Sequence, residues 1–165
     1  MPQASPDPFR ALGLQPSFDL DRAAVERAYL ARAAAAHPDL NQGEADDSAT
    51  LNDARKALLN SESRANALLA ALGGPSPSEH KALPYGFLVE IMQTRLEIEQ
   101  AAEESDPEAL ARWKDWADDQ RSDYINRISA AFAETDRSPA SLAAIRETLN
   151  AWRYIERLIE QLPSS

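Results

Sequence analysis

His37, Pro38 and Asp39 place an imidazole and a carboxylate on either side of a proline. Such a pair could transfer protons as a general acid and base, or it could form a rigid contact surface for another protein. Proline fixes its own φ and disfavours helical geometry for the residue before it, so we expect a helix to end near Ala36 and a stiff turn to follow. A tripeptide of this kind is weak evidence by itself, because it often marks only a helix end.

Two amphipathic helices are expected to flank the tripeptide. Asp19 or Asp21 can cap the first helix, and Ser48 can cap the second. The apolar residues of each helix recur at the three-to-four spacing of a buried face. They are Val25, Ala28, Tyr29 and Ala36 in the first helix, and Leu51, Ala54 and Leu58 in the second. We therefore expect an antiparallel helical pair with the tripeptide at its tip.

With these flanks, most of residues 7 to 72 resembles a J domain, the module that stimulates ATP hydrolysis by DnaK-class chaperones. The opening, from Asp7 to Leu14, is similar to the short first helix of that family. Further similar residues fall in its third and last helices: Asn52, Ala54, Leu58, Arg64, Ala65, Leu68 and Leu69. Two positions depart from the family pattern, because Ala36 replaces a common aromatic residue and Ser61 replaces a usual proline.

The J-domain resemblance implies a set of chaperone-binding residues. They are His37, Pro38 and Asp39, with Arg22 and Arg27 on the preceding helix. Arg22 and Arg27 lie about 140° apart around that helix with Glu26 between them, so we expect only a modest positive field. We interpret Arg32, which falls inside the apolar stripe, as a side chain packed at the core edge rather than as a chaperone contact.

Composition excludes several classes of function. The chain has no cysteine and two histidines, His37 and His80, so we expect no metal site and no cofactor. Its net charge of −10 disfavours binding to nucleic acid or to anionic lipid. No run approaches the roughly 18 apolar residues of a membrane span, and the first six residues lack the features of a signal peptide. We expect a cytoplasmic protein whose partners are proteins.

Glycine and proline divide the chain into two domains. We expect a J domain in residues 1–74 with a disordered tail in residues 1–6, a linker in residues 75–83, and a C-terminal antiparallel three-helix bundle in residues 84–163. His80 is interpreted as a solvated linker residue. Helix starts are marked by Pro84, by Asp106 with Pro107, and by Ser138 with Pro139. The expected fold is therefore all-α, with a J domain formed by a helical hairpin and short flanking helices.

The expected core faces of the second and third bundle helices are continuous. The second offers Leu110, Trp113, Ala117, Tyr124, Ile128 and Ala131, and the third offers Leu142, Ile145, Leu149, Trp152 and Ile159. The first bundle helix, about residues 85–104, carries two stripes. One consists of Phe87, Ile91, Ile98 and Ala101, and the other of Leu88, Met92 and Leu96, edged by Val89. The second stripe either packs on the third bundle helix or against the J domain, or it forms an exposed patch, rimmed by Glu99 and Glu103, that binds a protein.

The first bundle helix also resembles HscB-type co-chaperones, the J proteins dedicated to iron–sulfur cluster assembly. The resemblance lies in Phe87-Leu88-Val89-Glu90 followed by Arg95 and Glu97. It implies that this helix binds a cluster scaffold protein of the IscU type, with an aromatic contribution from the last helix. The corresponding residues are Leu88, Val89, Met92, Gln93, Leu96, Gln100 and Tyr154. Gln93, Leu96 and Gln100 replace acidic residues of well-known members, so a weaker electrostatic contribution is expected.

The two resemblances together imply a protein with no catalytic residue of its own. It would stimulate a DnaK/HscA-class ATPase chaperone and deliver an IscU-type scaffold to it. A general J protein for unfolded clients is one alternative, and a J-like adaptor that does not stimulate the ATPase is another. An enzyme that uses His37 and Asp39 as an acid–base pair is the least supported, because nothing else in the chain indicates a nucleophile, a metal site or a phosphate loop.

Overall fold

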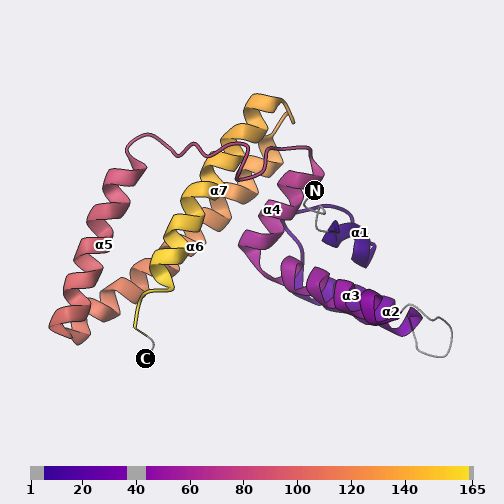
Figure 1. Cartoon of the computed structure of the whole chain (residues 1–165), viewed down its shortest axis with the longest axis horizontal. Helices are drawn as coiled ribbons and strands as arrows, with labels where there is room; N and C mark the ends of the chain where they lie inside the picture. Colours follow the sequence, from indigo (N-terminus) through magenta and orange to yellow (C-terminus); the bar gives the residue numbers. More distant parts are fainter. Residues whose placement is uncertain (1–5, 37–43, 164–165) are drawn as a thin grey trace. The chain divides into compact units, whose positions relative to one another are not determined.

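The computed structural model describes residues 6–36 and 44–163, and this part of the chain contains seven α-helices and no β-strand. The predicted all-α class is confirmed (Figure 1). The chain divides into two compact units, Met1–Gly73 and Gly74–Ser165. Each unit has its own apolar core, and each is therefore described separately.

Four helices form the N-terminal unit: α1 (Pro8–Leu12), α2 (Arg22–Ala35), α3 (Glu44–Leu59) and α4 (Ser61–Ala71). Helices α2 and α3 lie side by side, and both α1 and α4 pack against α3 (Figure 1). The fully buried side chains at the centre include Phe9, Val25, Leu58 and Leu69. One helical pair with two short flanking helices is the arrangement that the sequence predicts.

Side-chain caps explain where the helices of this unit begin. Asp7 Oδ1 accepts a hydrogen bond from the Phe9 N–H at 2.9 Å, and Asp21 Oδ1 accepts one from the Ala23 N–H at 3.2 Å. Asn60 caps α4, which leaves Ser61 at the first helical position, where proline is common in other helices. The prediction that Ser48 caps α3 is wrong, because the helix already begins at Glu44. Glu44 and Ala45 are good helix formers and extend it.

Three long helices form the C-terminal unit: α5 (Phe87–Glu104), α6 (Pro107–Glu134) and α7 (Pro139–Ile159). Asp106 and Ser138 cap α6 and α7, each followed by a proline in the first turn, as predicted. Helix α5 begins at Phe87 rather than near Tyr85, because Gly86 before it adopts a left-handed conformation with φ of 80°.

Helix α7 supplies most of the C-terminal core. All five residues of its predicted core face are buried, and the Trp152 ring stacks on Tyr124 of α6 with centroids 6.0 Å apart. On α6, Ala117, Tyr124 and Ile128 are buried as predicted. The exceptions are Leu110, Trp113 and Ala131, which are only half-buried.

The half-burial of Leu110 and Trp113 follows from the lengths of the helices. Helix α6 has 28 residues, whereas its antiparallel neighbour α7 has 21. At 1.5 Å per residue, α7 falls about 10 Å short of the beginning of α6. The first two turns of α6 therefore extend beyond the end of α7 (Figure 1).

Candidate functional site

His37, Pro38 and Asp39 lie outside the residues that the structure describes, as do residues 1–5 of the predicted tail. The helix before the tripeptide ends where the sequence predicts. Helix α2 runs to Ala35, and the N–H of its C-cap, Ala36, donates to the Arg32 carbonyl at 3.1 Å. The tripeptide thus follows the end of α2 directly in the sequence.

Glu26 on α2 is bound by a residue that the sequence reasoning did not consider. Arg55 of α3 donates from Nε to Glu26 Oε2 at 2.7 Å and from Nη2 to Oε1 at 2.9 Å. This bidentate bond holds the pKa of Glu26 below its usual value. The same guanidinium lies over the Tyr29 ring, 5.2 Å from its centroid. Glu26 therefore offsets Arg22 and Arg27 less than its position between them suggests.

Leu30 is a further exposed residue of α2 that the sequence reasoning missed. Its side chain is 63% exposed. At 100° per residue it lies on the same side of the helix as Arg22, Glu26 and Arg27. We call these four residues the outer face of α2. The signal that could have revealed Leu30 is its position opposite the buried Val25.

Arg32 is an exposed residue, and its interpretation as a side chain at the edge of the apolar core stays a prediction. Its guanidinium lies over Gly13, the C-cap of α1, whose φ of 68° is left-handed. A Cβ at position 13 would meet Nη2 of Arg32. The Arg32 side chain therefore reaches from α2 to the end of α1.

The second apolar stripe of α5 is exposed, and the alternative in which it packs on the third bundle helix is wrong. Leu88, Val89, Met92 and Leu96 are 47%, 73%, 65% and 65% exposed. Tyr154 of α7, another predicted site residue, is 41% exposed. We call these five residues the apolar surface of α5. Because Ile91, Ile98 and Ala101 fill the buried side of the helix, the apolar surface is not needed for the core.

Tyr154 is positioned by a ring contact between two helices. Its ring meets Phe87 edge to face, with centroids 6.0 Å apart and planes at 76°. Such pairs favour this geometry because the ring edge is positive and the ring face negative. Phe87 therefore holds Tyr154 beside the first turn of α5.

Hydrogen bonds along α5 organise the polar edge of the apolar surface. Three pairs with i,i+4 spacing connect Gln93 with Glu97 at 3.1 Å, Arg95 with Glu99 at 2.8 Å, and Gln100 with Glu104 at 2.9 Å. The amides of Gln93 and Gln100 thus donate to glutamates of their own helix. The charge of Glu99 is also paired. What remains available to a partner is mainly apolar area.

The segment between α4 and α5 is bonded to α7. We call residues 74–86 the strap. Arg146, which is 3% exposed, donates from Nε to the Pro75 carbonyl at 2.9 Å. Asn150 donates to the carbonyls of His80 at 2.9 Å and Ala82 at 3.0 Å. His80 is therefore not a solvated linker residue, and its Nε2 lies 3.0 Å from Glu147 Oε1.

Comparison with known proteins agrees with this two-part architecture. The family described as HSCB C-terminal oligomerisation domain matches residues 83–163. The Co-chaperone protein HscB homolog of Neisseria meningitidis serogroup B is 28% identical over 166 residues, covering 95% of this chain and 97% of that protein. The homolog of Bordetella petrii is 28% identical over 171 residues, covering 98% and 97%. The chain belongs to the HscB-type co-chaperones.

Solved structures of HscB proteins share the fold. The crystal structure of human co-chaperone protein HscB has a TM-score of 0.73 and 25% identity, covering 98% of this chain and 82% of the human one. Chaperone HscB from Vibrio cholerae has a TM-score of 0.67 and 23% identity, covering 94% and 99%. The architecture of this HscB-type chain is accordingly an N-terminal J domain with a C-terminal helical bundle.

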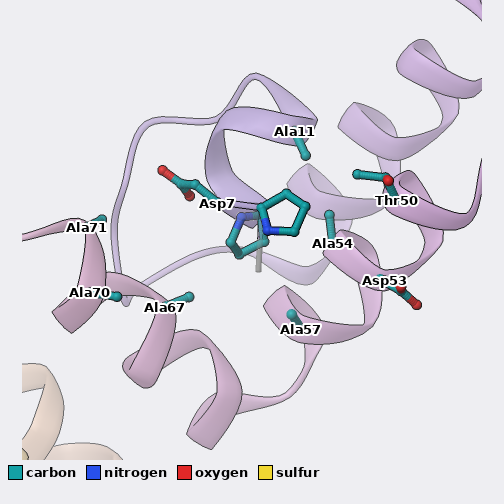
Figure 2. A pocket seen from close by; sticks show the side chains of 11 residues that line it. Asp7, Ala11, Thr50, Asp53, Ala54, Ala57, Ala67, Ala70 and Ala71 are labelled. Carbon is teal, nitrogen blue, oxygen red and sulfur yellow. The ribbon is translucent and has the colours of Figure 1, made fainter. Parts of the chain in front are cut away.

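A cavity of about 840 Å³ lies within the J domain of this HscB-type protein, between α1, α3 and α4 (Figure 2). Its wall is mostly alanine, and one of its two carboxylates, Asp7, already caps α1. Within residues 6–36 and 44–163, no three metal-binding side chains cluster together. In the same part of the chain, no helix is long and apolar enough to cross a membrane. The candidate functional surfaces are therefore the outer face of α2 and the apolar surface of α5.

Proposed function

We propose that this protein is a co-chaperone of iron–sulfur cluster assembly that stimulates a DnaK/HscA-class ATPase and delivers an IscU-type scaffold protein to it. The J domain docks on the ATP-bound chaperone while the C-terminal bundle holds the scaffold. His37 and Asp39 trigger hydrolysis on the chaperone, which contains the reacting groups. This chain itself is not an enzyme and uses no cofactor.

The exposed apolar surface of α5 carries the proposal. Four large apolar side chains form a continuous exposed stripe on α5, and Tyr154 of α7 extends it. Surface hydrophobic residues are normally scattered singly, so a continuous stripe indicates a binding surface. Its position next to a well-filled core means that its residues contribute little to folding. Central apolar and aromatic residues of this kind are the usual anchors of protein interfaces. The HscB-type match supports a folded scaffold as the partner.

The proposal is tested by replacing Leu88, Met92, Leu96 and Tyr154 together by alanine. Central interface anchors cost about 1 to 2 kcal/mol each on truncation, so we expect scaffold affinity to fall more than a hundredfold. Titration of the purified IscU-type scaffold, followed by calorimetry, measures the affinity. Basal stimulation of the chaperone ATPase should remain, because the J domain is unchanged.

A matched control replaces the exposed Asp118 and Asp119 of α6 by alanine, which should leave scaffold affinity unchanged. Circular dichroism and melting temperature establish that both variants fold. Unchanged scaffold affinity in a folded four-alanine variant would contradict the proposal. Equal binding of wild type to a denatured polypeptide would favour a general J protein instead.

A further inference from the structure

The outer face of α2 combines an apolar centre with two positive flanks. Leu30 is the one large apolar side chain of the N-terminal unit that is exposed among its described residues. Ala23 and Ala34 are also exposed and lie within about 40° of Leu30 around the helix, which extends the apolar strip along α2. Single exposed leucines are common on protein surfaces, so the flanking charges must identify a partner.

The charges on this face favour an acidic partner. Arg22 and Arg27 are exposed, and within the described residues no hydrogen bond or ion pair engages them. Glu26, which lies between them, is bound at both carboxylate oxygens by Arg55 from the opposite helix. In the described part of the chain, Arg22 and Arg27 therefore lie on the same side of α2 as Leu30 without a hydrogen bond or ion pair of their own, and Glu26 between them is paired with Arg55.

The two arginines and Leu30 favour some binding partners of the outer face of α2 over others. A second copy of the chain would bring the same two arginines against the first pair, and like charges repel. An unfolded polypeptide offers no fixed pair of carboxylates. A folded surface with an apolar contact point bordered by carboxylates is complementary to Leu30, Arg22 and Arg27 at once.

We propose that Leu30 is a specificity residue for the chaperone, inserting between carboxylates into an apolar contact point on the chaperone surface. This inference rests on the proposed function, because it assumes that the J domain meets an ATPase chaperone. It adds that the contact depends on an aliphatic side chain as well as on positive charge.

Two exposed leucines allow a matched test, because Leu30 and Leu96 are 63% and 65% exposed. Leu30→Ser should raise the concentration needed for half-maximal ATPase stimulation about tenfold and leave scaffold affinity unchanged. Leu96→Ser should weaken scaffold binding, and the control with Asp118 and Asp119 replaced by alanine should leave both stimulation and scaffold affinity unchanged. Both leucine variants should retain the wild-type melting temperature, since exposed positions contribute little to stability.

Leu30→Lys distinguishes the apolar contact from a general preference for positive charge. We expect it to weaken stimulation as Leu30→Ser does. Tighter binding of Leu30→Lys to the chaperone, or stimulation by a folded Leu30→Ser at the wild-type concentration, would overturn the inference and leave the proposed function standing. A dimer in light scattering that Leu30→Ser disrupts would assign the face to a second copy and also overturn it.

Failure of the wild-type protein to stimulate the chaperone would have a different meaning. It would overturn the proposed function together with this inference. The single-turnover ATPase rate of the chaperone, measured with wild type and both leucine variants in parallel, supplies all of these outcomes.

Discussion

The charge of Glu26 is neutralised by Arg55, which lies 29 residues away in the sequence. The bidentate bond from Arg55 lowers its pKa, so at neutral pH Glu26 is ionised and already neutralised. The stability from this pair is present above the usual carboxylate pKa of 4.5 and is lost as pH falls through the lower folded-state value. Across the physiological range, Arg22 and Arg27 therefore act as the available charges.

At the residue scale, His37→Gln or Asp39→Asn should abolish ATPase stimulation and leave helix content unchanged. The expectation comes from the sequence, which places both side chains on a turn after α2, where a substitution usually changes stability by less than about 0.5 kcal/mol. A single-turnover ATPase assay with circular dichroism checks it. A large fall in melting temperature with stimulation retained would show that the tripeptide is structural.

Gly13→Ala should destabilise the J domain by about 1 kcal/mol, because φ is 68° and an alanine in this region is strained. The new Cβ would also meet Arg32, but it meets the mobile end of a long side chain, which can move away. Gly73→Ala is the matched control, since φ is 80° there and nothing lies within 4 Å of the Cβ position. Urea unfolding should give similar losses for both, and a much larger loss at Gly13 would show that Arg32 is fixed.

At the scale of the element, Asn150→Ala should release the strap from α7. It removes two hydrogen bonds to carbonyls on either side of the exposed Lys81. Losing about 1 to 2 kcal/mol of attachment should raise the rate of trypsin cleavage after Lys81 about tenfold, because cleavage follows the population of the open segment. Thr148→Ala is the control, since its hydroxyl bonds only within α7, to the Ala144 carbonyl. Equal cleavage rates in both variants would contradict the conclusion that Asn150 attaches the strap to α7.

Local signals in the sequence predict most of the helices. A capping side chain followed by proline marks the starts of α6 and α7, because both effects act within one turn. The exposure of the second stripe on α5 could not be predicted from the sequence. Periodicity distinguishes two apolar sides of a helix, but it does not show which side packs against another helix. The strap and the Glu26 pair were missed because their partners lie 29 to 71 residues away in the sequence.

At the scale of the whole molecule, chaperone binding should depend only weakly on salt. Two available arginines and an apolar Leu30 leave few charge pairs for salt to screen, with a Debye length of about 8 Å at physiological ionic strength. We expect affinity to fall less than about fivefold between 50 and 300 mM NaCl, measured by calorimetry. Arg22→Gln with Arg27→Gln should remove most of that dependence. A steep fall in the wild type would reveal further basic contacts.

The apolar surface of α5 also has a consequence for the protein before it meets any partner. An exposed apolar stripe of this size favours self-association of the protein. A net charge of −10 opposes it, because the protein molecules repel one another. Repulsion between like-charged molecules weakens as salt is added, but apolar adhesion does not. The acidic composition thus acts as colloidal protection for the uncovered surface, and the concentration at which the free protein stays dispersed is set by ionic strength.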